Sequence, residues 1–301
     1  MNNKTAIHLF LYFFSVIIYS QEQLPDTTFV KKINFNVTKK SLTNDELRKK
    51  RNSYEYNYLL QDEESNIQLI YNPELETTIK KYYTYKWLPK IFGLLSYYEP
   101  MFEELLNYYK LPTDLKYIAV IESNLNPQAG SNMGASGLWQ FMPQTGKNYG
   151  LVKNQYINLF YDPYFSTDAA CRYFVYLYQL FEDWNLAISA YNCGQGCVLK
   201  AIKKAKSKEY FKVRNYLPKE TRDYVMRFHS VKFLHKQSEI YYDYEFRLPI
   251  SFDKVKEHKI KSKTSFTKFC KEMKINLQMT YFLNPHIITE IIPTNTFIYY
   301  L

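Results

Sequence analysis

One carboxylic acid in the sequence is a candidate for proton transfer. Glu122 follows the apolar run Ile118-Ala119-Val120-Ile121 and precedes Ser123. The pattern predicts a helix that leaves the core at this glutamate. Apolar surroundings disfavour a charged carboxylate and raise its pKa, and a raised pKa suits a general acid that works near neutral pH. From this run alone, a surface glutamate at a helix end is the more frequent arrangement.

Two later segments carry side chains that suit a carbohydrate groove. A glycine-rich connection over 130–150 contains Leu138-Trp139-Gln140-Phe141-Met142, which places an amide between large aromatic rings. Tyr191 and Asn192 end another helical run. Aromatic walls and a few placed polar groups are typical of small-molecule and glycan sites. Core packing is expected for two of the three aromatic residues Trp139, Phe141 and Trp184.

Other common catalytic and binding motifs do not occur. The glycines of 130–150 lack the spacing of a nucleotide-binding loop, and Gly134-Ala135-Ser136-Gly137 lacks that of a nucleophile elbow. The five histidines are scattered and no CxxC or HExxH motif is present, so we expect neither a metal nor a cofactor. No nucleic-acid-binding motif accompanies the basic charge, so a nucleic-acid partner is not expected.

Composition and the N-terminus indicate a folded, exported protein. The chain has 301 residues, of which 46% are hydrophobic and 23% charged, which excludes wholesale disorder. Its net charge of +10 favours an anionic partner such as a membrane surface, a nucleic acid or an acidic polymer. Lys4, an apolar run and Ser20 have the pattern of a cleaved signal peptide over residues 1–20. An uncleaved membrane anchor is the alternative. We therefore expect the periplasm or cell envelope of a bacterium.

The four cysteines are few for an exported chain. Their spacings do not resemble a dense disulfide framework. We expect partly buried, reduced thiols, with neighbouring Cys193 and Cys197 at a helix junction as the alternative. The other two cysteines are Cys171 and Cys270.

Helical periodicity dominates between residues 70 and 238, and strand signals are sparse before Tyr241. The predicted fold is therefore mainly α, a helical globule. We expect five principal helices: one with the face Leu94, Tyr98, Met101, Leu105 and Tyr108; one from Pro112 with Leu115, Ile118, Ala119 and Ile121; one capped by Ser166; one over Trp184 to Asn192; and one after Leu217-Pro218 with Tyr224, Phe228, Val231 and Leu234.

The flanks of this body have a different composition. Residues 21–69 form a polar leader that we expect to be partly disordered, with a charged run at 46–51. Residues 252–274 carry eight lysines and three acids. The pattern there predicts a small α+β appendage with a strand near Lys254–Ile260, a helix over Ser265–Met273 and a strand near Thr296–Leu301. The resulting boundaries are 1–20, 21–69, 70–238 and 239–301.

The motifs taken together closely resemble the family-1 lytic transglycosylases, in particular the membrane-bound murein enzymes of the D subtype. The resemblance covers about residues 70–238 and rests on several motifs in the expected order. They are Glu122-Ser123; Gly137-Leu138-Trp139-Gln140-Phe141-Met142-Pro143-x-Thr145-Gly146; Asp162-Pro163; Asp183-Trp184; Ala190-Tyr191-Asn192-x-Gly194; and Leu217-Pro218-x-Glu220-Thr221-x-x-Tyr224-Val225.

The resemblance implies a lysozyme-like, soluble-lytic-transglycosylase fold that acts on peptidoglycan glycan strands. The cut would fall at the β-1,4 bond between N-acetylmuramic acid and N-acetylglucosamine and leave a 1,6-anhydro end. Glu122 would be the single catalytic acid and base, so the second carboxylate of ordinary glycosidases is not required. Ser123 would support Glu122, while Gln140, Tyr191 and Asn192 would contact the substrate. Tyr191 would also orient Glu122.

The chain departs from the family pattern in three places. Relatives carry an acidic and basic cluster where this chain has Asn158-Leu159-Phe160-Tyr161 and keeps only Asp162. Cys193 and Cys197 replace small or polar residues. Residues 239–301 resemble a degenerate LysM repeat, a glycan-binding module, or the spacer before one. Sugar binding, or contact of their lysines with anionic wall polymers, would follow.

Two other functions are also compatible with the sequence. The altered cluster is compatible with a non-cleaving murein-binding or scaffold protein. A lysozyme-type hydrolase of the same fold would need a second carboxylate, for which Asp162 and Asp168 are the nearby candidates in the sequence. Peripheral membrane association is a further expectation, and the sequence does not predict an oligomeric state.

Overall fold

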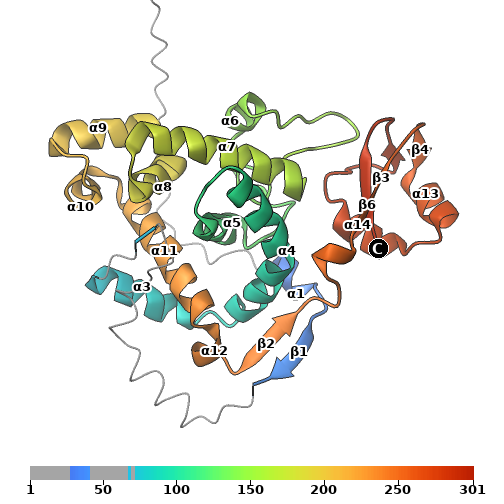
Figure 1. Ribbon diagram of the computed structural model, residues 1–301, viewed down its shortest axis with the longest axis horizontal. Coiled ribbons are helices and arrows are strands. Elements are labelled where there is room, and N and C mark those ends of the chain that lie inside the picture. The colour runs from blue at the N-terminus through green and yellow to red at the C-terminus, as the bar shows by residue number, and fades with distance from the viewer. Residues whose placement is uncertain (1–27, 41–66, 69–71) are drawn as a thin grey trace, which may run out of the picture.

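A computed structural model describes residues 28–40, 67–68 and 72–301 of the chain (Figure 1). The predicted signal peptide over 1–20 and the charged run at 46–51 lie outside these residues. In the described part of the chain, no helix has both the length and the apolar character that a membrane-spanning segment needs.

The predicted helical body is confirmed. Its central helix α11 packs against α3, α5 and α8, and α4 packs against α5 and α7 (Figure 1). The α-helices are α3 (Pro73–Tyr83), α4 (Leu88–Tyr108), α5 (Lys116–Ser123), α6 (Pro143–Asn148), α7 (Pro163–Phe181), α8 (Trp184–Cys193), α9 (Gln195–Ala205), α10 (Tyr210–Val213), α11 (Lys219–Lys236) and α12 (Ser238–Tyr241). Two 3-10 turns, η2 (Thr113–Leu115) and η3 (Arg214–Tyr216), precede α5 and α11.

Most of the predicted apolar helix faces are buried. Three details differ from the prediction: the exposure of two side chains and the first residue of one helix. Tyr108, at the end of α4, is 77% exposed because the helix passes beyond the core at its last turn. Ile121 of α5 is only half-buried. Helix α7 begins at Pro163 instead of Ser166, because the Asp162 carboxylate accepts hydrogen bonds from the first free backbone amides and caps the helix. Ser166 instead lies buried within the first turn.

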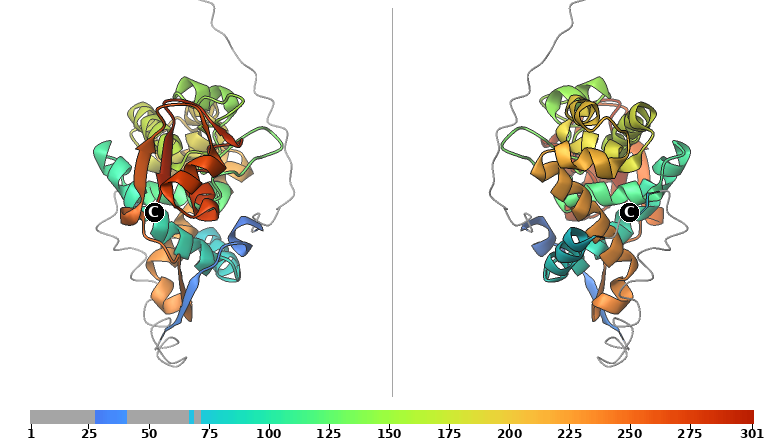
Figure 2. Two further views of the ribbon diagram at one scale, coloured as in Figure 1. Left: turned by 90° about the vertical axis from the view of Figure 1, so that its right-hand side faces the viewer. Right: turned by 90° about the vertical axis from the view of Figure 1, so that its left-hand side faces the viewer.

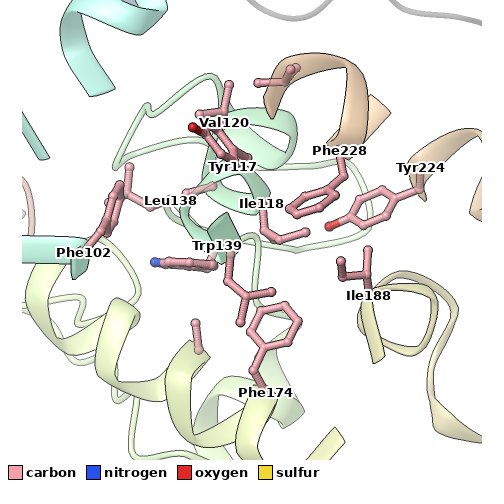
Figure 3. Close-up of a cluster of buried hydrophobic side chains, with 14 of the residues drawn as sticks. Phe102, Tyr117, Ile118, Val120, Leu138, Trp139, Phe174, Ile188, Tyr224 and Phe228 are labelled. Carbon is pink, nitrogen blue, oxygen red and sulfur yellow. The ribbon is translucent and has the colours of Figure 1, made fainter. Parts of the chain in front are cut away.

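A core of large side chains holds α5 in place (Figure 3). It joins residues of α4, α5, α7, α8 and α11 to the segment that follows Gly137. Trp139, Tyr117 and Tyr224 are among the largest fully buried side chains of the described residues. Helix α5 is therefore packed against α4 and α11. The labelled members of the core are Phe102, Tyr117, Ile118, Val120, Leu138, Trp139, Phe174, Ile188, Tyr224 and Phe228.

The described part of the predicted leader packs on the body. It contains α1 (Thr28–Lys31) and β1 (Asn36–Lys39), and Val30 is fully buried. Strand β1 pairs in antiparallel register with β2 (Tyr244–Arg247), which follows α12. Strand β2 in turn packs on α4 at Gly93, where a Cβ would lie 2.2 Å from the carbonyl oxygen of Phe246. Glycine is therefore required at position 93 for this close approach.

The expected α+β appendage is present at the C-terminus, and we call residues 252–301 the C-terminal module. Strand β3 pairs in antiparallel register with β6, and β4 pairs with β5. The module has a small core of its own that includes Ile260, Phe266, Phe269 and Ile298. Its elements are η4 (Phe252–Lys254), β3 (Lys256–Lys259), β4 (Thr264–Ser265), α13 (Phe266–Met273), α14 (Leu277–Leu283), β5 (Ile291–Ile292) and β6 (Phe297–Tyr300).

The C-terminal module is docked on the helical body, and Figure 2 (left) views the molecule from the module's side. The Gln128 side-chain amide donates to the carbonyl of Pro285 at 2.9 Å, and the Asn158 amide donates to the carbonyl of His286 at 2.9 Å. The His286 ring lies 3.2 Å from the Asp162 carboxylate, and both side chains are buried. The module therefore rests on the residues that cap α7.

The expectation of four free thiols is wrong for one pair. Cys193 ends α8 and Cys197 lies in the first turn of α9, and a disulfide joins them with their Cα atoms 5.9 Å apart. The chain reverses at Gly194, which has a φ of 82°, and this turn brings the two sulfurs together. Cys171 and Cys270 are free and buried. Burial raises the pKa of the Cys171 thiol to about 12, so that thiol is unreactive at neutral pH.

Candidate active site

The Glu122 carboxyl group is held by one hydrogen bond at the C-terminal end of α5. The Tyr224 hydroxyl, from the second turn of α11, donates to Glu122 Oε1 at 2.6 Å. Glu122 itself is half-buried. Among the described residues, no group donates a hydrogen bond to Oε2. One carboxyl oxygen is therefore fixed by the protein, and the other is available to a substrate.

Burial of the carboxyl raises the pKa of Glu122 from 4.5 to about 7. The hydrogen bond from Tyr224 and the charge of Arg227 lower this pKa, while the charge of Glu220 raises it slightly. The carboxyl group is thus largely desolvated, although the Glu122 side chain is not fully buried. About half of the Glu122 side chains carry a proton at pH 7, which is the state that a general acid requires.

Tyr224 is the hydrogen-bond partner of Glu122 that sequence patterns did not reveal. The sequence placed it on the buried face of α11 and within a family motif, but assigned it no role. It is 2% exposed, and burial together with the charge of Glu122 raises its pKa well above 10. It therefore stays protonated and acts as a permanent hydrogen-bond donor. A tyrosine on a buried helix face was the available signal, because a buried hydroxyl usually has a partner.

Ser123 supports Glu122 through the backbone and not by direct contact. Its hydroxyl donates to the carbonyl of Leu138 at 2.8 Å, and it also lies 3.1 Å from the carbonyl of Ala119. This bond ties the last turn of α5 to the segment 138–141. The two residues that follow α5 at its end, Asn124 and Leu125, have positive φ angles of 52° and 59° and turn the chain away from the helix.

Gln140 shapes the loop that faces this end of α5. Its φ is 46°, and its side-chain amide donates to the carbonyls of Gly137 at 2.9 Å and Ala129 at 3.2 Å. A Cβ on Gly137 would lie 1.8 Å from the carbonyl oxygen of Phe160, so only glycine fits there. The Gln140 Oε1 atom accepts no hydrogen bond from the described residues, which leaves an acceptor for a ligand.

Tyr191 does not hydrogen-bond to Glu122. Its hydroxyl donates to the carbonyl of Trp139 at 2.7 Å, and its ring stacks on Phe174 with a centroid distance of 4.7 Å. The charge of Glu122 contributes to the raised pKa of Tyr191, so the two side chains are neighbours. The predicted orienting role is therefore filled by Tyr224, while Tyr191 positions the segment that carries Gln140.

Asn192 joins the end of α8 to the start of α11. Its Oδ1 accepts a hydrogen bond from the Thr221 hydroxyl at 2.8 Å. This contact fixes the rotamer of the amide. Its Nδ2 has no partner among the described residues and can donate to a ligand. Tyr191 and Asn192 thus lie at the end of α8, as the sequence predicted.

Two of the three aromatic residues Trp139, Phe141 and Trp184 are core residues, as expected. Trp139 is fully buried and Phe141 is 2% exposed. The Trp139 ring nitrogen donates to the Thr167 hydroxyl at 2.9 Å. Trp184 is half-buried and stacks on Tyr178 with a centroid distance of 4.0 Å.

The altered segment 158–162 lies against the C-terminal module. Asn158 is 2% exposed, and its Oδ1 accepts from the Phe160 amide at 3.2 Å. Asp162 caps α7 and contacts His286, whereas Asp168 pairs with Arg172 and accepts from the Tyr109 hydroxyl. Both aspartates are thus engaged in structural contacts. Across the ranges 28–40, 67–68 and 72–301, no cluster of three or more metal-ligating side chains is found.

We expect activity at this site to decline as the pH rises through about 7. A general acid must be protonated in the free enzyme, and the pKa of Glu122 is about 7. The second-order rate constant kcat/KM should therefore be flat on the acidic side and fall about tenfold per pH unit on the basic side. A pH–rate profile measures this directly. A profile that falls near pH 4.5 instead would contradict the role of burial.

Replacement of Tyr224 by phenylalanine should move that descending limb to higher pH. The hydrogen bond from Tyr224 lowers the pKa of Glu122, so its loss raises this pKa further. We expect kcat to fall about ten- to hundredfold, because a hydrogen bond to a charged group contributes roughly 1.5–3 kcal/mol. Phenylalanine fills the same space, so the helical circular dichroism should not change. A limb that stays in place would show that Tyr224 only packs.

The comparisons with known proteins agree with these motifs. Residues 99–213 match the family model described as "Transglycosylase SLT domain". The membrane-bound lytic murein transglycosylase D of Escherichia coli K12 is 36% identical over 136 residues, which cover 44% of this chain and 30% of the relative. A putative tributyltin chloride resistance protein of an Alteromonas strain is 39% identical over 99 residues, which cover 33% of this chain and 48% of the relative. The match thus spans less than half the length of these relatives.

Solved structures with partial similarity come from soluble lytic transglycosylases. The 70 kDa soluble enzyme of Escherichia coli has 22% identity and a TM-score of 0.42, over 55% of this chain and 30% of that one. A complex of the 70 kDa soluble lytic transglycosylase with bulgecin A has 22% identity and a TM-score of 0.44, over 66% of this chain and 31% of that one.

Proposed function

We propose that this protein is a peptidoglycan lytic transglycosylase, because residues 99–213 match the family model described as "Transglycosylase SLT domain". It cleaves the β-1,4 bond between N-acetylmuramic acid and N-acetylglucosamine without water and leaves 1,6-anhydro ends. The observation that carries the proposal is the single carboxyl group of Glu122, whose pKa is about 7 and whose Oε1 accepts a hydrogen bond from Tyr224.

In the first half of the reaction, the protonated Glu122 carboxyl donates its proton to the glycosidic oxygen, and the bond from that oxygen to the muramyl C1 breaks. Positive charge develops at C1, and Glu122 becomes a carboxylate. The Tyr224 hydroxyl stabilises this carboxylate, because a hydrogen bond to an ionised acceptor is stronger than one to a neutral acceptor.

In the second half, the Glu122 carboxylate takes the proton from the muramyl C6 hydroxyl, and the oxygen of that hydroxyl bonds to C1. The product is a 1,6-anhydro ring, and Glu122 regains the proton with which it began. One group thus acts first as acid and then as base, so its pKa must lie near the working pH. The free Oε1 of Gln140 and Nδ2 of Asn192 are the groups we assign to the sugar hydroxyl and N-acetyl groups, and Ser123 and Tyr191 hold the loop that frames them.

A lysozyme-type hydrolase is the less favoured candidate. Such an enzyme uses a second carboxylate opposite the acid. Asp162 caps α7, and Asp168 is paired with Arg172, so both candidates from the sequence are committed elsewhere. The raised pKa of Glu122 argues against the other rival, a non-cleaving scaffold, because a desolvated acid without a function would only cost stability.

Digestion of purified sacculi followed by mass spectrometry of the released fragments tests the proposal. A lytic transglycosylase releases fragments with 1,6-anhydro ends, which are lighter by one water than the reducing ends that a hydrolase leaves. Reducing ends would establish the hydrolase, and intact sacculi would favour the binding protein.

We also propose a location in the cell envelope and a glycan-facing role for the C-terminal module. The apolar N-terminal run, a basic net charge of +10 and the membrane-bound relative support the location. The module's two helices between the paired strands β3 and β6 are compatible with a LysM-like unit. Its many lysines suit an anionic wall polymer or a membrane surface as a further partner.

A further inference from the structure

A hollow of about 430 Å³ lies between α9 and the residues that precede α11, and it takes no part in the mechanism above. One wall is α9, which contributes Cys197, Lys200 and Lys204. The other wall is the junction of η3 and α11, which contributes Tyr216 and Leu217. We call this site the lysine hollow. Its size lies in the range of small-molecule and peptide sites.

Helix α11 and the disulfide connect the lysine hollow to the catalytic residues. Leu217 lines the hollow, Thr221 hydrogen-bonds to Asn192 one turn further along, and Tyr224 hydrogen-bonds to Glu122 at the next turn. Leu217 lies two residues before α11 begins, and from Lys219 to Tyr224 the helix rises about 7.5 Å. The first turns of α11 therefore join the wall of the hollow to the residue that hydrogen-bonds to Glu122. The disulfide between Cys193, which follows Asn192, and Cys197 ties the α9 wall of the hollow to the end of α8.

The chemistry of the lysine hollow favours an anionic ligand with some apolar surface. Lys200 and Lys204 are exposed, stand four residues apart and so share one face of α9. Neither forms an ion pair with an acid among the described residues, whereas Lys208 and Lys212 nearby do. Like charges at this spacing repel each other, and an anion between them relieves the repulsion. Tyr216 is 51% exposed and offers an aromatic face beside the buried Leu217.

We propose that the lysine hollow binds the peptide stem of the strand being cut, through the carboxylates of that stem. The proposal rests on the proposed function. The bond that Glu122 would protonate begins at the muramyl sugar, and the stem is attached to that same sugar. The stem therefore begins near Asn192, which we assign to the polar groups of the sugar, and extends from there along a wall of the groove. It combines carboxylate groups with small apolar side chains, which match the two lysines and the Tyr216–Leu217 surface.

The test compares glycan strands that carry stems with the same strands after an amidase has removed the stems. The double variant Lys200→Gln/Lys204→Gln should lower kcat/KM on stem-bearing strands by about three- to thirtyfold, as expected for the loss of two exposed charge pairs. Its activity on stripped strands should match that of the unmodified protein. The loss should shrink at high salt, because exposed charges are screened.

A matched control removes two charges from the same region without touching the hollow. Lys203→Gln/Lys206→Gln changes the net charge by the same amount at exposed positions that do not line it. This control should behave as the unmodified protein does on both substrates. An equal loss in both double variants, or an equal loss on both substrates, would overturn the proposal and indicate a general effect of charge or a different anion.

The experiment distinguishes a failure of the peptide-stem proposal from a failure of the proposed function. If the unmodified protein cuts stripped strands and the Lys200/Lys204 variant cuts stem-bearing strands equally well, the hollow proposal is wrong and the function stands. If the unmodified protein cuts neither substrate, the proposed function is wrong. Binding of labelled stem-bearing fragments then decides about the hollow, because weaker binding by the Lys200/Lys204 variant alone supports it and unchanged binding overturns it.

Discussion

Glu122→Gln is expected to abolish the release of anhydro fragments from sacculi while the protein stays folded. Glutamine keeps the shape of the side chain and can still accept the hydrogen bond that Tyr224 donates to Oε1. It cannot donate a labile proton to the glycosidic oxygen or take one from the C6 hydroxyl. General acid–base catalysis typically contributes about 10²–10⁴-fold. Since the proposed mechanism uses Glu122 in both steps, we expect a loss of at least about 10³-fold in kcat.

The same variant has a second, independent readout in its stability against pH. The pKa of Glu122 in the folded protein, about 7, is above its ordinary value of 4.5. Between pH 4.5 and pH 7 the Glu122 carboxyl is therefore mostly protonated in the folded state and mostly ionised in the unfolded state. The native protein consequently loses stability as the pH rises from 4.5 through 7. The loss amounts to about 3 kcal/mol at most. Glu122→Gln should not show it and should be the more stable protein at pH 8.

Urea unfolding at pH 5 and pH 8, with circular dichroism as the signal, measures this difference. A conservative comparison is Glu122→Asp, which keeps a carboxyl group but withdraws it from Tyr224 and should retain the pH-dependent loss in part. Full activity of Glu122→Gln would remove the residue from the chemistry. Equal pH dependence in both proteins would show that the Glu122 carboxyl is solvated in the native state.

Trp139→Ala is expected to cause the largest loss of stability of any single substitution considered. The ring is fully buried, contacts Phe102 edge-on at a centroid distance of 5.7 Å and donates to the Thr167 hydroxyl. Truncation of a buried tryptophan to alanine typically costs about 3–5 kcal/mol. Since small proteins are stable by about 5–15 kcal/mol in total, the midpoint of urea unfolding should drop sharply.

Trp184→Ala is the matched control for this prediction. The substitution is the same, but the Trp184 ring is half-buried and stacks on the partly exposed Tyr178. Its loss removes less buried area and leaves no enclosed cavity, so a cost of about 1–2 kcal/mol is expected. Equal midpoints for the two variants would contradict the core position of Trp139.

The Trp139 substitution should also reduce activity at temperatures at which the protein is still folded. The carbonyl of Trp139 accepts from the Tyr191 hydroxyl, and the carbonyl of the preceding Leu138 accepts from Ser123. A cavity under this segment would let the loop that carries Gln140 move relative to α5. The lost activity is therefore expected to appear in kcat/KM even after correction for the folded fraction.

The sequence predicted the helices well because their apolar faces have a regular spacing that does not depend on distant residues. The faces of α4, α5 and α11 follow this rule, and so does the glutamate at the end of α5. The end of α4 is the exception, because periodicity cannot show where a core stops. The start of α7 was placed three residues late, because Asp162 and Ser166 are both good helix caps and the fold selects the first.

The contacts that set the pKa of Glu122 could not be predicted from local sequence patterns. The bond from Tyr224 joins residues 102 positions apart. A hydroxyl on an apolar helix face cannot be assigned a partner until the helices are packed. The disulfide between Cys193 and Cys197 was misjudged for a related reason, because its formation depends on the turn at Gly194. Local patterns therefore singled out Glu122 as the candidate acid, whereas packing determines the pKa of its carboxyl group.

The pairing of β1 with β2 has a consequence for any attempt to transplant the catalytic body. The two strands lie more than 200 positions apart in the chain and flank the helices on both sides. A chimera that exchanged everything beyond residue 238 would discard β2, leave β1 without its partner and uncover Gly93 on α4. It would also remove the His286 side chain from the buried Asp162. A working cassette must therefore carry both flanks, and enzymes assembled from the helices alone should express as unstable fragments.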